Sequence, residues 1–149
     1  MTGVWVLVGT LVAGLLAGAL LARRNGRIRA AGPARAEHAL PAPVAAVLDT
    51  SATGPAVTLV QLSTTFCAPC RHARAVLGQL AERTDGLRHV ELDVTHQPQV
   101  AQQLGVLRTP TTLALGPEGD ELLRVSGVPK APELLAALEA HLTRARPTD

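Results

Sequence analysis

The chain has 149 residues, a formal net charge of +2 and two cysteines, and only 1% of its residues are aromatic. Five arginines between residues 22 and 40 carry the basic excess, and residues 41–149 are net negative, which argues against nucleic-acid binding. A single Cys-x-x-Cys pair cannot form the disulfide framework of a small secreted scaffold.

Residues 4–22 form an apolar run without a charged side chain, with Trp5 near one end and Arg23 and Arg24 after the other. As a helix the run spans about 28 Å, close to the hydrocarbon thickness of a bilayer. These features predict one uncleaved membrane anchor in contact with lipid. A cleaved signal peptide is the alternative, but it requires positive charge before the run and a small-x-small site after it.

The flanking charge predicts the orientation of this anchor. All five arginines follow the run, so the positive-inside rule places residues 23–149 in the cytoplasm. The inverted topology, with the rest of the chain on the outer side, is the alternative. Gly14 and Gly18 form a Gly-x-x-x-Gly pattern, which indicates either a helix-dimer face or the small residues common in membrane spans.

Composition then divides the chain further. Residues 23–43 are rich in arginine and then in alanine, glycine and proline, which predicts a linker, and residues 44–145 form the predicted domain. Val44 to Leu48 is a candidate short strand. The nearly continuous apolar run at 56–62 predicts a central strand. Apolar residues at three- and four-residue spacing predict a helix over 67–84.

The second half of the domain alternates strands and helices. Residues 87–95 alternate apolar and polar side chains, as in a strand near a sheet edge. Pro98 opens a short helix that stops at Gly105. Residues 111–115 and 121–126 predict a hairpin, and a last helix begins at Pro132.

The element order is therefore β-α-β-α-β-β-α, which indicates an α/β fold with helices on both faces of a mixed four-stranded sheet. Right-handed crossovers predict that the first three strands are parallel and the fourth antiparallel. The predicted strand order is second, first, third, fourth, which places the most apolar strand inside the sheet.

Cys67-Ala68-Pro69-Cys70 lies where a buried strand gives way to a helix. Two thiols on one helical turn indicate either a redox pair or metal ligands. Zinc binding by Cys67, Cys70 and His72 is the weaker alternative, because structural zinc takes four protein ligands. We therefore predict no metal and no cofactor.

Three features together resemble a thioredoxin-fold protein of the membrane-anchored bacterial kind, over residues 55–145. They are the Cys67–Cys70 pair after a strand, Val106 to Thr111 before the third strand, and Gly127 after the fourth. The resemblance implies a single-pass protein of the bacterial plasma membrane that exchanges thiols with protein disulfides or dithiols and takes electrons from an unidentified donor. A non-enzymatic binding module or a redox sensor, with Cys67–Cys70 as a regulatory disulfide, is the alternative.

The resemblance also implies roles for individual residues. Cys67, at the helix N-terminus where a thiolate is favoured, is the expected nucleophile, and Cys70 is the resolving thiol. Thr109-Pro110 corresponds to the cis-proline of the family, and the backbone of Thr109 is expected to pair with an extended substrate.

Several positions depart from the usual thioredoxin pattern. Phe66 stands in place of tryptophan, Gln61 in place of a buried acid, and Glu91 in place of the lysine beside that acid. Altered proton transfer and a narrow range of partners are therefore expected. Pro69 and Arg71 are further modulators near the site. Arg108 either belongs to the docking face or merely precedes a strand, and we expect surface positions for His89, His96 and His141.

Overall fold

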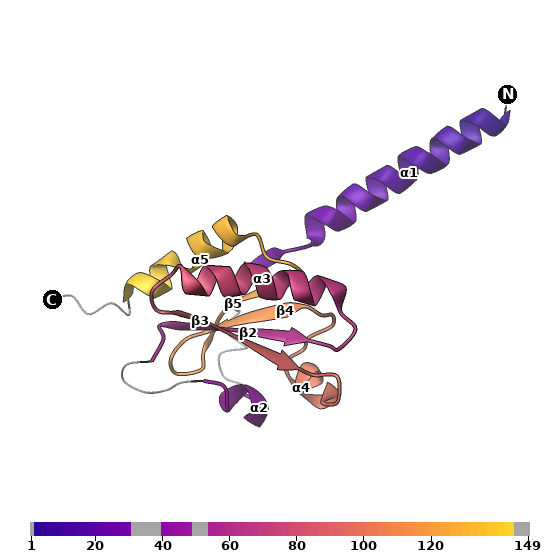
Figure 1. The fold of residues 1–149 in the computed structure, drawn as a ribbon. Coiled ribbons are helices and arrows are strands. Elements are labelled where there is room, and N and C mark those ends of the chain that lie inside the picture. Colours follow the sequence, from indigo (N-terminus) through magenta and orange to yellow (C-terminus); the bar gives the residue numbers. More distant parts are fainter. Residues whose placement is uncertain (1, 31–39, 49–53, 145–149) are drawn as a thin grey trace.

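The computed structural model describes residues 2–30, 40–48 and 54–144. Five strands form one mixed sheet with helices on both faces (Figure 1). The elements are α1 (Thr2–Arg24), β1 (Arg27–Ala30), α2 (Ala42–Ala45), β2 (Val57–Ser63), α3 (Ala68–Glu82), β3 (Leu87–Asp93), α4 (Pro98–Gln103), β4 (Thr111–Leu115), β5 (Glu121–Ser126) and α5 (Ala131–Arg144). The strand order is β1-β5-β4-β2-β3, which contains the predicted order of the four main strands.

The central strand β2 is buried along its whole length and separates two apolar cores. Val57 and Leu59 face α3 and α5, whereas Val60 and Leu62 face α2 and α4. Successive side chains of a strand point to opposite faces, so a strand covered on both sides needs apolar residues at nearly every position. Gln61, which is fully buried, and Ser63 are the polar residues of β2 on the α3 face.

The direction of β4 differs from the prediction. β2 and β3 are parallel, but β4 runs antiparallel to β2, so the prediction of three parallel strands is wrong. The six-residue helix α4 spans about 9 Å, whereas a seven-residue strand spans about 23 Å. The helix does not return the chain along the sheet, and β4 therefore starts at the edge where β2 and β3 end.

Residues 27–30, inside the predicted linker, form the edge strand β1. This strand pairs antiparallel with β5, Ile28 opposite Val125, and Ile28 packs against the core beneath α3 and α5. The sequence Arg-Ile-Arg-Ala does alternate, but four residues are too few to distinguish a strand from a charged linker. The stretch 31–39 of that linker lies outside the described residues.

The predicted strand at Val44 to Leu48 is wrong as well. Residues 42–45 form a single helical turn, α2, which begins directly after Pro41. Proline favours the first positions of a helix because its ring fixes φ near the helical value. Val44 is fully buried and closes the core on the α4 side of the sheet.

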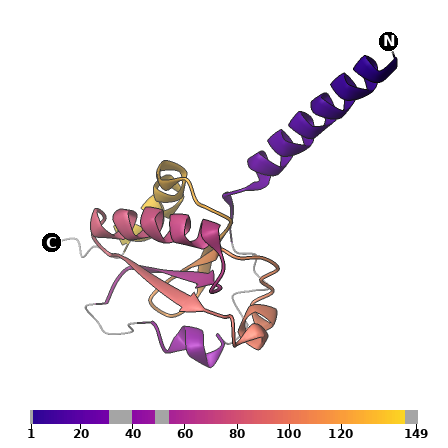
Figure 2. The same ribbon diagram turned by 45° about the vertical axis from the view of Figure 1, so that its right-hand side comes forward.

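Helix α1 projects away from the sheet in both views (Figures 1 and 2). Its segment Gly3–Ala22 has a mean hydropathy of 2.3 and is long enough to cross a bilayer. Its large apolar side chains are exposed around the helix, Trp5 to 75% and Leu15 to 73%. Only Asn25 and Gly26 separate α1 from β1, so the apolar helix joins the sheet edge almost directly.

Gly26 makes this junction tight. Its φ of +73° lies in the left-handed region, and its N–H donates to the Ser126 carbonyl at 2.8 Å. A Cβ atom on Gly26 would lie 2.5 Å from the carbonyl oxygen of Val128, a contact that the backbone cannot relieve by rotating a side chain. Only glycine fits this position without strain.

We expect Gly26→Ala to lower the free energy of unfolding by about 1–2 kcal/mol, because alanine is strained at positive φ and would displace β1. Urea unfolding of the full-length chain in detergent measures this loss. Gly78→Ala is the matched control, because Gly78 lies in α3 with open space around it. Equal unfolding free energies for wild type and Gly26→Ala would show that β1 is not docked on β5.

Candidate active site

The cysteine pair lies at the start of α3. Cys67 and Cys70 form a disulfide with their Cα atoms 5.2 Å apart. Cys67 is the N-cap residue in an extended conformation and is partly exposed, whereas Cys70, one turn on, is 2% exposed. Pro69 lies in the first turn, where its missing N–H leaves no acceptor unpaired. Once the disulfide is reduced, the helix dipole favours a thiolate at Cys67.

The loop before β4 lies beside the cysteine loop. The Thr109–Pro110 peptide bond is cis, as the resemblance implied, and Pro110 is buried. The hydroxyls of Thr109 and Thr64 are 3.4 Å apart, and the carbonyl of Thr64 accepts the N–H of Cys67 at 3.2 Å. The predicted substrate-binding residues, Thr109 and Pro110, and the predicted catalytic pair therefore lie at the same end of the central strands β2 and β4.

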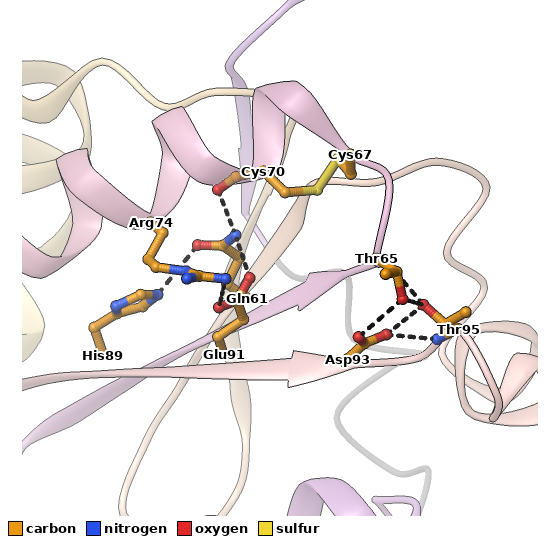
Figure 3. Close-up of polar contacts among 9 residues, drawn as sticks. All are labelled: Gln61, Thr65, Cys67, Cys70, Arg74, His89, Glu91, Asp93 and Thr95. Carbon is orange, nitrogen blue, oxygen red and sulfur yellow. Dashed lines mark hydrogen bonds and ion pairs between the residues drawn. A yellow bond between two sulfur atoms is a disulfide. The ribbon is translucent and has the colours of Figure 1, made fainter.

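Gln61 connects the central strand to the helix above it (Figure 3). Its Nε2 donates to the carbonyl oxygen of Cys70 at 3.0 Å and to Oε1 of Glu91 at 3.5 Å. Its Oε1 lies 3.2 Å from Nε2 of His89, and because an amide oxygen only accepts, that imidazole nitrogen carries the proton. Glu91 also forms an ion pair with Arg74 of α3. A polar network thus lies directly beneath Cys70.

His89 is part of this network, and its predicted surface position is wrong. It is half-buried between β2 and α3, and this burial lowers its pKa below the ordinary 6.5. The neighbouring Glu91 carboxylate raises the pKa of His89 to a lesser extent, and Arg74 adds to the lowering. His89 is therefore neutral at pH 7. A neutral imidazole carries one ring proton, and this proton is enough for its hydrogen bond to Gln61.

A second polar cluster fixes the loop that enters the site (Figure 3). Asp93 accepts the backbone N–H of Thr95 at 2.8 Å, and Thr95 Oγ1 accepts the N–H of Thr65 at 2.9 Å. The side-chain hydrogen bond from Thr95 is the largest cause that lowers the pKa of Asp93. These bonds hold residues 64–66 against the end of β3, while the ring of Phe66 is 99% exposed beside Cys67.

The structure thus brings most of the predicted site residues together. Arg71 is the exception, because it lies exposed on α3 and forms no ion pair with the described residues. Sequence reasoning missed Arg74 and His89 as parts of the site. Arg74 follows Cys70 by four residues, a spacing that places both on one helix face. His89 could be placed only with the register of β2 on β3, which the sequence does not reveal.

Comparison with known proteins agrees with this geometry. A model of the thioredoxin family matches residues 49–140, a segment that begins after α1, β1 and α2. A thioredoxin of Staphylococcus saprophyticus is 32% identical over 87 residues, which are 58% of this chain and 83% of that protein. Thioredoxin 1 of Nostoc sp. is 32% identical over 85 residues, 56% of this chain and 78% of its own.

Solved structures show the same similarity. A mutant thioredoxin from Halobacterium salinarum matches with a TM-score of 0.53 at 25% identity, over 59% of this chain and 76% of its own. The thioredoxin NaTrxh from Nicotiana alata matches with a TM-score of 0.51 at 31% identity, over 58% of this chain and 73% of its own.

The lowered pKa of His89 predicts a specific pH dependence of stability. Below its ordinary pKa of 6.5, the unfolded chain binds a proton at this position more readily than the folded chain. The contribution of neutral His89 to the free energy of unfolding is therefore fully present above pH 6.5. It is lost as the pH falls from 6.5 through the pKa that His89 has in the folded chain. We expect His89→Gln to flatten the fall in unfolding free energy between about pH 6.5 and pH 5, measured by urea unfolding.

Asp93 does not obscure this window, because its pKa is lowered from 3.8 and its contribution is lost only at more acidic pH. If the unfolding free energies of wild type and His89→Gln fall with the same slope between about pH 6.5 and pH 5, burial does not lower the pKa of His89.

Proposed function

Because the chain belongs to the thioredoxin family and is a thiol–disulfide oxidoreductase with protein disulfides as its general substrates, we propose that Cys67 is the attacking thiol and Cys70 the resolving one. The observation that supports this assignment is the difference in exposure. Cys67 is partly accessible at a helix N-terminus, whereas Cys70 is 2% exposed and reaches only a partner sulfur already bonded to Cys67.

The proposed cycle transfers two electrons. The Cys67 thiolate attacks one sulfur of a substrate disulfide, the substrate S–S bond breaks, and the departing thiolate takes a proton. Cys70 then loses its proton and attacks Cys67, which restores the Cys67–Cys70 bond and releases the second substrate thiol. The substrate disulfide is reduced and the cysteine pair is oxidised. A donor dithiol of another protein runs both steps in reverse. One donor thiolate attacks Cys67 and displaces Cys70, the second donor thiol then attacks the mixed disulfide and releases Cys67, and the donor is left as a disulfide.

The surroundings of the pair have proposed supporting roles. The backbone of Thr109 and the ring of Pro110 receive an extended substrate segment, and the exposed ring of Phe66 contacts it. The amide of Gln61 takes no proton from Cys70, so water accepts that proton. Gln61 instead holds the Cys70 carbonyl and keeps the first turn of α3 in place.

We expect Cys67→Ser to reduce insulin disulfides no faster than dithiothreitol alone, because serine forms no mixed disulfide. We expect Cys70→Ser to stop at the mixed disulfide, which intact mass spectrometry detects as an adduct that excess reductant releases. A wild-type rate for Cys67→Ser would refute the assigned nucleophile and favour a binding module that uses the pair as a sensor.

We also propose that α1 anchors the chain in a bacterial plasma membrane with the thioredoxin domain in the cytoplasm. The length and apolar composition of Gly3–Ala22 support the anchor, and the arginines that follow it support the orientation.

Reporter enzymes fused after Asp149 test the orientation. We expect activity from a reporter that works only in the cytoplasm and none from a reporter that works only after export. Activity from the exported reporter alone would place the domain on the outer side.

A further inference from the structure

A basic cavity of about 610 Å3 lies between β1, β5 and the loop that precedes Thr109. Four arginines and one glutamate line it, which leaves an excess of three positive charges: Arg27, Arg29, Arg108, Arg124 and Glu121. Leu123 and Val125 point into the core beneath α3 and α5, so Arg124 between them points to the opposite face of the sheet. The cavity therefore opens on the α4 side.

The floor of the cavity is rigid and already neutralised. Arg124 is 8% exposed, and its Nε and Nη2 donate to the two carboxylate oxygens of Glu121, each at 2.8 Å. Its Nη1 donates to the carbonyl of Leu104 at 2.8 Å. Three hydrogen bonds fix the guanidinium of Arg124, so it does not reorient to meet a ligand. The remaining positive charge of the cavity therefore lies on the arginines at its rim.

Arg27 and Arg29 supply two of these three charges from β1, and Arg108 supplies the third. The side chains of Arg27 and Arg29 are exposed, and neither forms an ion pair with the described residues. The register places Arg29 directly opposite Arg124 and Arg27 opposite Ser126. Arg27 and Arg29 are two residues apart on β1 and therefore lie on the same face of the strand, so that one acidic segment can pair with both.

The cavity shares a loop with the candidate active site. Its third wall, residues 105–108, runs straight into the Thr109–Pro110 bond, and Thr109 lies 3.4 Å from Thr64 in the cysteine loop. The side chain of Leu107 on this wall is 97% exposed. A segment that extends from a bound substrate cysteine would therefore cross an apolar rim before it meets the arginines.

We propose that this cavity binds an acidic segment of the protein whose disulfide is exchanged, with aspartate or glutamate carboxylates against Arg27 and Arg29. The inference rests on the proposed function and adds to it a class of substrate. Guanidinium groups bind carboxylates through two parallel hydrogen bonds. The apolar Leu107 favours a polypeptide over a lipid headgroup, because a headgroup alone makes no use of an apolar rim beside the disulfide.

Peptides with a single disulfide test this inference on the full-length chain in nanodiscs of phosphatidylcholine. One peptide carries aspartate and glutamate beside the cysteine, and its partner carries asparagine and glutamine. We expect the reduced chain to react about fivefold faster with the acidic peptide, through a lower KM rather than a higher kcat. This ratio should fall toward one as the ionic strength rises.

The double variant Arg27→Gln and Arg29→Gln should abolish most of the preference. The matched control is Arg83→Gln with Arg88→Gln, which removes the same charge at exposed positions outside the cavity and should keep the ratio. A ratio that survives in the cavity variant overturns the proposal. So does an effect of the cavity variant that is present only after an anionic lipid is added to the nanodiscs, because the cavity would then serve a headgroup.

A cysteine-free version of the acidic peptide separates this inference from the proposed function. Fluorescence anisotropy measures its binding to the oxidised chain, where no exchange takes place. Binding that is lost in the cavity variant supports the acidic site even if no peptide is reduced, and that combination would refute the exchange cycle alone. Reduction of both peptides at equal rates, without anisotropy change, would refute the cavity alone.

Discussion

The hydrogen bond from Gln61 to the carbonyl of Cys70 joins the buried central strand to the first turn of α3, and the position of the cysteine pair depends on it. A buried amide must have partners, and both ends of Gln61 find them in the helix above and in the strand β3 beside it. The same hydrogen bonds keep two ionisable groups, Glu91 and His89, one side chain away from Cys70. Gln61 and Glu91 thus stand in place of the buried acid and the neighbouring lysine of the usual thioredoxin pattern.

The edge strand β1 has a comparable effect at the other side of the molecule. A free linker of about 20 residues would let the domain move some 25 Å from a membrane anchor. Docking of β1 on β5 leaves two residues between the apolar helix and the sheet. It also completes a basic cavity beside the loop that carries Thr109. A segment that reads as a linker in the sequence therefore shapes the surface beside that loop.

The sequence predicted the parts of the fold that depend on local pattern. The strands at 57–63, 111–115 and 121–126 and the helices α3, α4 and α5 lie within a few residues of their predicted positions, because periodicity and proline or glycine mark them. The sequence did not predict the features that depend on contacts between distant segments. These are the direction of β4, the pairing of β1 and the environment of His89. Cys67 and Cys70 could be found from spacing alone, whereas Arg74 and His89 join the site only through the register of β2 on β3.

Family membership and the partly exposed position of Cys67 indicate that Cys67–Cys70 is an exchangeable pair rather than a structural disulfide. Equilibration of the full-length chain with glutathione or dithiothreitol buffers of known potential, followed by mass measurement of alkylated thiols, distinguishes the two. We expect a reversible two-electron transition between about −270 and −120 mV, the range of thiol–disulfide oxidoreductases. A pair that stays oxidised in buffers below about −300 mV would instead be a structural disulfide and would refute exchange at this site.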